Sequence, residues 1–165
     1  MQEPVKQRIY IETSVVSYLA AGPTRDLIRA ARQELTCEWW GSCHRSFAPH
    51  VSHVVLREIS TGDPAAAARR LAIVAGLPVL TMDSATEDLA AAIADARVLP
   101  ASALDDILHL AVATVHGMDF LVTWNCRHLA NAQLMGRLSD RIEEEGFVPP
   151  VICTPEGLSG GDGHV

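Results

Sequence analysis

Lysine is almost missing from this sequence, and acidic residues outnumber basic ones. The 165 residues include twenty Asp or Glu and thirteen Lys or Arg, which gives a formal net charge of −7. Lys6 is the only lysine, so the other twelve cations are arginines. A negative net charge argues against a protein that is held to nucleic acid by bulk charge. Arginine suits local, geometric contacts with phosphate, so the composition remains compatible with a small basic groove.

Long apolar runs and closely spaced cysteines are also absent. No apolar stretch approaches the roughly 20 residues of a membrane-spanning helix, and residues 1–6 are polar, unlike a secretory signal. We therefore expect a cytoplasmic protein that makes no contact with membranes. The four cysteines form no CxxC pair, and zinc held by Cys37, Cys43 and His44 would lack a fourth ligand nearby. Reduced and mostly buried thiols are the expectation.

Length and apolar content indicate one packed domain. Apolar residues make up 48% of the chain and charged residues 20%, the proportions of a globular protein. A chain of this length has no room for a second domain of ordinary size. We predict a single domain over residues 1–158 and a flexible, glycine-rich tail over residues 159–165.

Short β-rich runs alternate with helical patterns along the chain. This alternation predicts a parallel sheet with helices on both faces, whose ligand site lies at the carboxyl ends of the strands. The expected strands cover residues 8–11, 47–51, 79–81, 120–123 and 151–153, and the expected helices cover 15–20, the segment after Thr24, 54–61, 64–76, 84–96, 102–117 and 132–145.

Two helix starts carry recognisable capping signals. Thr24 is the expected N-cap of a helix whose apolar side includes Leu27 and Ile28. Ser102 and Asp105 have the spacing of a capping box, which accounts for Asp105 without any function.

Two carboxylates are not explained by packing. Glu12 follows directly on an apolar strand. A charge at the N-cap of the next helix, favoured by the helix dipole, is the alternative interpretation, but Thr13 or Ser14 could supply that cap. Asp106 points about 100° further round its helix than Asp105, in line with the apolar row that contains His109. Because a buried carboxylate is costly unless it is paired, we interpret Glu12 and Asp106 as functional. His109 itself is interpreted as a histidine at the edge of the core.

The remaining acids are weaker candidates. Glu58 taken alone is best interpreted as a solvated glutamate on a helix, Asp83 as an N-cap and Asp119 as structural. Acids that meet at strand ends form a site for Mg²⁺ or Mn²⁺, whose chemistry suits hydrolysis of a phosphodiester. The residues alone therefore indicate an α/β domain with an acidic metal site.

Four stretches in this order resemble a PIN domain, specifically the VapC-type ribonuclease toxins of toxin–antitoxin pairs. The resemblance covers about residues 8–155, and the stretches that carry it are 9–15, 54–59, 106–111 and 120–125. It implies a three-layer α/β/α sandwich with a mostly parallel sheet, RNA cleavage with Mg²⁺ or Mn²⁺, a small antitoxin partner and a homodimer.

The resemblance also implies a set of site residues. The acidic quartet of the family falls on Glu12, Glu58, Asp106 and Asn125. Glu12 and Asp106 would hold the metal directly, and Glu58 would bind it through water or activate the nucleophile. Two departures matter, because Glu12 stands where the family usually has Asp and Asn125 stands where many members have an acid. The loss of that charge should favour one metal over two.

Two other functions compete with a nuclease. Asn125 and the net charge of −7 are compatible with a catalytically silent PIN-like module that binds RNA or protein. A metabolite phosphohydrolase would need a nucleophile motif or a glycine-rich phosphate loop, and the sequence has neither. Arg127 and His128 are candidate contacts for the RNA backbone, and an ordinary polar loop explains them equally well.

Overall fold

A sheet of five parallel strands forms the centre of the protein. The computed structural model describes residues 5–159, so most of the predicted tail (159–165) and the first four residues lie outside it. The strand order is β3-β2-β1-β4-β5, and every neighbouring pair is parallel. The strands are β1 (Gln7–Ile11), β2 (Phe47–Ser52), β3 (Val79–Leu80), β4 (Phe120–Val122) and β5 (Val151–Cys153).

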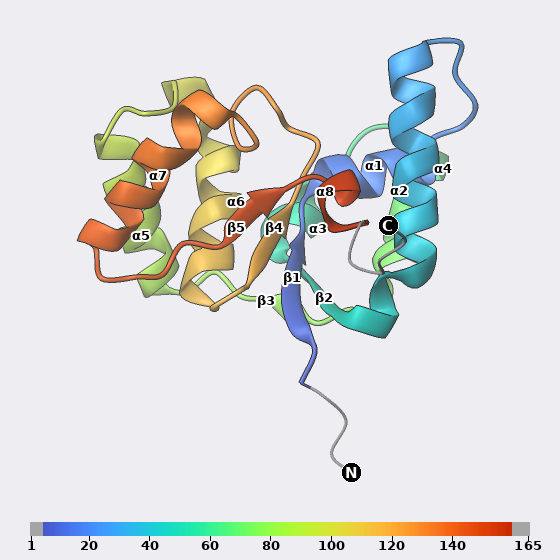
Figure 1. The fold of residues 1–165 in the computed structure, drawn as a ribbon. Coiled ribbons are helices and arrows are strands. Elements are labelled where there is room, and N and C mark those ends of the chain that lie inside the picture. The colour runs from blue at the N-terminus through green and yellow to red at the C-terminus, as the bar shows by residue number, and fades with distance from the viewer. Residues whose placement is uncertain (1–4, 160–165) are drawn as a thin grey trace, which may run out of the picture.

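The helices lie in two groups on either side of this sheet. Figure 1 shows α5, α6 and α7 together at one side and α1, α2 and α4 at the other. The expected α/β architecture, with helices flanking a parallel sheet, is therefore confirmed. The helices are α1 (Thr13–Ala20), α2 (Leu27–Ser46), α3 (His53–Ile59), α4 (Pro64–Val74), α5 (Ser84–Asp95), α6 (Leu104–Val115), α7 (Ala132–Glu144) and α8 (Pro155–Leu158), with a 3₁₀ turn at Ala101–Ala103.

β1 is the middle strand and the most buried one. Ile9, Tyr10 and Ile11 are all fully buried, which explains why this strand carries apolar residues on both faces. Ile11 pairs in register with Val122 of β4. The residues that follow these two strands, Glu12 and Thr123, therefore leave the sheet side by side.

The long helix α2 begins differently from the sequence prediction. Asp26, not Thr24, is the N-cap, and its carboxylate accepts from the backbone N–H groups of Ile28 and Arg29 at 3.0 Å each. Leu27 and Ile28 are 85% and 68% exposed, so the predicted burial of these two residues is wrong. The first turns of α2 project from the body of the molecule (Figure 1).

The start of α6 also differs from the prediction. Its N-cap is Ala103, which makes no side-chain cap, because a 3₁₀ turn at Ala101–Ala103 replaces the expected capping box. Asp105 instead forms an exposed ion pair with Arg57 at 2.5 Å. Asp83 and Asp119 are structural as predicted: Asp83 caps α5, and Asp119 accepts from the backbone N–H of Arg8.

The cysteines are free thiols, as expected, but they are not mostly buried. Cys43 is buried and Cys153 is partly buried, whereas Cys37 and Cys126 are exposed. Burial raises the pKa of both Cys43 and Cys153 to about 11. Among residues 5–159, no helix is both long and apolar enough to cross a membrane.

Candidate active site

The site lies where β1, β2 and β4 end. The backbone N–H of Glu12 donates to the carbonyl of Val122 at 3.1 Å, which fixes the chain after β1 against the end of β4. Ser52 ends β2, and α3 with Glu58 follows it directly. The parallel sheet therefore collects polar residues from three chain segments at one edge, as the sequence predicted.

Glu12 is almost completely buried, with 5% of its surface exposed. Its Oε2 accepts from the backbone N–H of Ser14 at 3.0 Å, from the Ser14 hydroxyl and from the Thr123 hydroxyl at 2.7 Å. Glu12 is thus itself the N-cap of α1, so the prediction that Thr13 or Ser14 supplies this cap is wrong. The helix dipole and three donors stabilise the buried carboxylate, which explains how the core tolerates it.

Glu58 and His109 form a short, mostly buried pair. His109 Nε2 lies 2.5 Å from Glu58 Oε1, and the Thr13 hydroxyl donates to the same oxygen at 2.9 Å. The same Nε2 lies 3.9 Å from Glu12 Oε1. Burial on its own would raise the pKa of Glu58, but the hydrogen bond and charge of His109, with the Thr13 hydrogen bond, outweigh burial and lower that pKa. Glu58 is therefore a carboxylate near neutral pH.

Behind His109, a chain of hydroxyl groups fixes the imidazole. The Tyr10 hydroxyl lies 2.6 Å from His109 Nδ1 and 2.7 Å from the Ser52 hydroxyl, and all three side chains are buried. Burial raises the pKa of Tyr10 well above its usual value, so the phenol keeps its proton. A hydroxyl both donates and accepts, so this chain gives Tyr10, Ser52 and the His109 ring a partner in the core.

Asp106 belongs to a second cluster, formed with Asn125 and His128. The Asn125 amide donates to Asp106 Oδ1 at 2.9 Å, and His128 Nδ1 lies 2.6 Å from Oδ2. Asn125 Oδ1 in turn accepts from the backbone N–H of His128 at 3.1 Å. The side chains of Asp106 and His128 are each 18% exposed, so this cluster borders solvent.

Thr123 connects the two clusters. Its hydroxyl donates to Glu12 and accepts from the backbone N–H of Asn125 at 2.9 Å. The candidate residues Glu12, Asp106 and Asn125 therefore belong to one hydrogen-bonded network, and His109 and Thr13 tie Glu58 to the same edge of the sheet. The sequence pattern predicts His109 only as a core-edge residue and does not predict the contacts of Tyr10 and Ser52 with it.

One sequence signal could have revealed His109. It lies one helical turn after Asp106 on the same row of α6, so its ring faces the edge of the sheet that Asp106 borders. Its partners come from β1 and α3, which a helical pattern cannot identify. His128 was named only as a candidate phosphate contact, and its bond to Asp106 depends on the fold of the loop after β4.

The donor set suits a hard divalent cation in kind, because its free groups are carboxylate and amide oxygens. Within residues 5–159, however, no three His, Cys, Asp or Glu side chains are grouped closely enough to hold a metal ion. His109 lies next to the carboxylates of Glu12 and Glu58, while Asn125 and His128 hold both oxygens of Asp106. Among residues 5–159, Glu12 Oε1 and Glu58 Oε2 accept no hydrogen bond, so these are the carboxylate oxygens open to a cation.

Comparison with known proteins identifies the fold. No protein-family model matches the chain, and no curated protein matches its sequence. Among solved structures, it is similar to a chain in the crystal structure of VapBC2 from Rickettsia felis bound to a DNA fragment from their promoter. The TM-score is 0.60 at 11% identity, over 90% of this chain and 98% of that chain. The likeness confirms, at the level of the fold, the resemblance to PIN domains drawn from the sequence.

Proposed function

We propose that this protein is an endoribonuclease that hydrolyses RNA phosphodiester bonds with Mg²⁺ or Mn²⁺. The observation that carries the proposal is the buried Glu12 carboxylate, joined through Thr123 and Asn125 to Asp106 at the carboxyl edge of a PIN-like sheet. Glu12 also caps α1, so packing accounts for one of these carboxylates. Asp106 caps no helix, and its convergence with Glu12 and Glu58 at one edge is explained if the three act together on a ligand.

The residues divide into two roles. Glu12 and Asp106 would hold the cation directly, and Glu58 would act on the attacking water. When bound, the cation would supply Lewis-acid chemistry and raise the acidity of water. Thr13 and His109 occupy Oε1 of Glu58, and Oε2 accepts no hydrogen bond from residues 5–159. Oε2 is therefore the atom that would take a proton from water, while Asn125 would orient the phosphate.

We also propose that the nuclease is the toxin of a toxin–antitoxin pair and forms a homodimer. The similar Rickettsia felis structure is a VapBC2 complex bound to DNA from its own promoter, which supports a small partner protein for this chain as well. A partner that places a basic side chain among Glu12, Glu58 and Asp106 would neutralise them and silence the site.

The test is cleavage of a structured RNA pool by the purified protein in the presence of Mn²⁺, with an excess of EDTA as control. Cutting that requires the cation and is restored by adding Mn²⁺ back would support the proposal. A folded, partner-free protein that leaves the pool intact at any Mn²⁺ concentration would contradict it.

A catalytically silent binding module is the alternative. It is favoured by the hydrogen bonds that already occupy Asp106 and by the absence of a three-ligand cluster among the described residues. The two functions differ in metal affinity. A nuclease should melt at a higher temperature in millimolar Mn²⁺, because a ligand that binds only the folded state stabilises it, whereas a silent module should not.

A further inference from the structure

A cavity beside the candidate site has no role in the function proposed so far. It has a volume of about 450 Å³ and lies between α1 and the first half of α2. From α1 it is lined by Ser14, Ser17 and Tyr18, which share one face of that helix at helical spacing. From α2 it is lined by Arg29 and Gln33, which are one turn apart.

The inner end of the cavity reaches the proposed nuclease site. Ser14 lines the cavity, and its hydroxyl donates to the Glu12 carboxylate and accepts from the backbone N–H of Trp124 at 2.8 Å. A ligand in the cavity therefore contacts Ser14, whose hydroxyl is hydrogen-bonded to the Glu12 carboxylate. A volume in the range of roughly 300–1,000 Å³ is typical of small-molecule sites.

The lining combines an aromatic ring with polar groups that have no protein partner. Among residues 5–159, the Tyr18 hydroxyl makes no hydrogen bond and the Arg29 guanidinium makes no ion pair. Gln33 donates its amide N–H to the carbonyl of Ala21 at 2.5 Å, which leaves its side-chain oxygen free to accept. A phenol ring, a guanidinium and an amide are groups that stack on unpaired bases and bond to their edges.

The cavity is also built before any ligand arrives. The Gln33 bond ties the end of α1 to α2 beside the cavity. Tyr18 packs edge-on against Trp124 with ring centroids 6.0 Å apart, and Arg32 lies 5.1 Å from the centroid of the same Trp124 ring. An unpaired base would enter a site whose walls are already held, which lowers the entropy cost of binding.

We propose that this cavity binds one unpaired nucleotide of the RNA, next to the bond that is cut, and that Tyr18, Arg29 and Gln33 determine which base it accepts. The inference rests on the proposed nuclease function, because only then does a nucleotide near Glu12 adjoin the reacting bond. It adds a specificity site on helices that contribute little to the chemistry.

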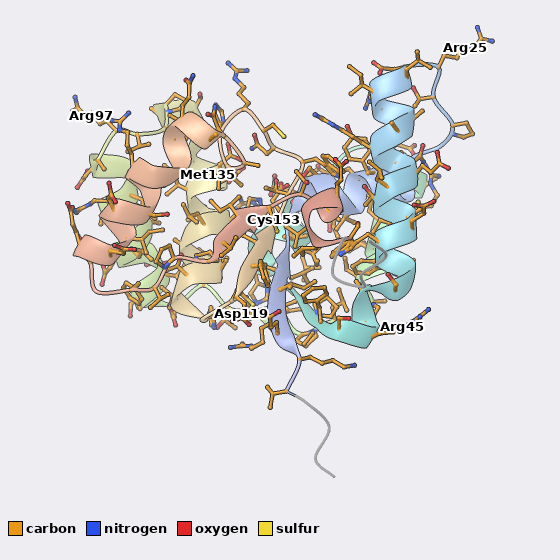
Figure 2. All side chains as sticks on the ribbon, in the orientation of Figure 1. Arg25, Arg45, Arg97, Asp119, Met135 and Cys153 are labelled. Atoms are coloured by element: carbon orange, nitrogen blue, oxygen red, sulfur yellow. The ribbon has the colours of Figure 1, made fainter. Side chains whose placement is uncertain are left out.

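The first test maps cleavage sites in a random single-stranded RNA pool cut by the wild type, Arg29→Ala and Tyr18→Phe. Arg45→Ala is the matched control, since Arg45 is an exposed arginine at the opposite end of α2 (Figure 2). We expect Arg29→Ala to cut the preferred sites about tenfold more slowly and Tyr18→Phe to broaden the base preference at one position. Arg45→Ala should leave the rate and the map unchanged. Unaltered maps for both cavity variants would overturn the inference while the nuclease stands.

The second test measures binding without cleavage. Each substitution is placed in an Asp106→Asn protein, and fluorescence anisotropy follows binding of a labelled random RNA of about ten nucleotides. If the wild type cuts no RNA, the nuclease proposal fails. This binding assay then tests separately whether the cavity binds RNA. Binding about tenfold weaker in Arg29→Ala than in Arg45→Ala supports the cavity as an RNA site. Equal binding, or none, overturns it.

Discussion

At the scale of single residues, the site is a set of carboxylates whose protein partners are unusually complete. Glu12 accepts three hydrogen bonds on one oxygen, and Asp106 has a partner for each of its two oxygens. His109 is buried with a hydroxyl behind it and a carboxylate in front. Hydrogen-bond partners of this kind position side chains to within a fraction of an ångström, so the removal of any one partner should lower the stability of the fold.

Removal of the Tyr10 hydroxyl should destabilise the fold. Tyr10→Phe keeps the ring but leaves His109 Nδ1 and the Ser52 hydroxyl without their shared partner in the core. We expect a loss of about 1–3 kcal/mol in the free energy of unfolding, the usual cost of an unsatisfied buried group. Urea unfolding measures it. Tyr18→Phe is the control, because the Tyr18 hydroxyl makes no hydrogen bond within residues 5–159, and equal losses in the two variants would contradict the account.

Glu58 should make the stability sensitive to acid. The pKa of Glu58 is lower in the folded protein than the ordinary value of 4.5. The ionised side chain therefore stabilises the fold at pH values above 4.5, and this stabilisation is lost as the pH falls through the lower pKa of the folded state. Glu58→Gln should therefore be less stable than the wild type at neutral pH, and the difference should shrink on acidification below 4.5. Urea unfolding at several pH values tests this. Exposed Glu34→Gln should show no such trend, and a constant difference for Glu58→Gln would count against the assignment.

At the scale of elements, the strands and the starts of α4, α5 and α7 were predicted closely, whereas the caps of α1, α2 and α6 were not. β1 and β4 contain short apolar runs that end at polar residues, a signal local to the sequence. The caps of α1 and α6 depend on contacts with other elements, which the local sequence pattern does not reveal. Glu12 caps α1 because the end of β4 fixes its position, and the capping box at Ser102 is displaced by a 3₁₀ turn. The same limit hid His109, whose partners come from other elements.

The start of α2 offers a test at this scale. Asp26→Ala removes two hydrogen bonds to backbone N–H groups and should cost about 0.5–2 kcal/mol of helix stability. Thr24→Ala should cost less, since Thr24 accepts only from the backbone N–H of Asp26 at 3.2 Å. Because the first turns of α2 project from the body, the loss should appear first as faster amide hydrogen exchange there. Faster exchange in Thr24→Ala than in Asp26→Ala would reverse the assignment of the cap.

At the scale of the whole molecule, the parallel sheet brings distant residues to one edge. Glu12 and Asp106 could be singled out from the sequence because each is a carboxylate placed where packing favours an apolar or neutral group. Glu58 could not be singled out in this way, since its place depends on how α3 packs against α1 and α6. The net charge of −7 argued against binding by bulk charge, but it did not reveal that Arg29 lines a cavity that Ser14 also lines, or that Arg32 lies over the Trp124 ring.

The most direct test of the central claim is the rate of Mn²⁺-dependent RNA cleavage in two neighbouring variants, Asp106→Asn and Asp105→Asn. Asp106 belongs to the hydrogen-bonded network at the sheet edge, whereas Asp105 makes only an exposed ion pair with Arg57. The account predicts that Asp106→Asn loses at least about a hundredfold in rate while it still unfolds in a single cooperative transition, which shows that the variant is folded. Asp105→Asn should stay within about twofold, because exposed ion pairs contribute little. Equal rates in the two variants would contradict the assignment of Asp106 to the chemistry.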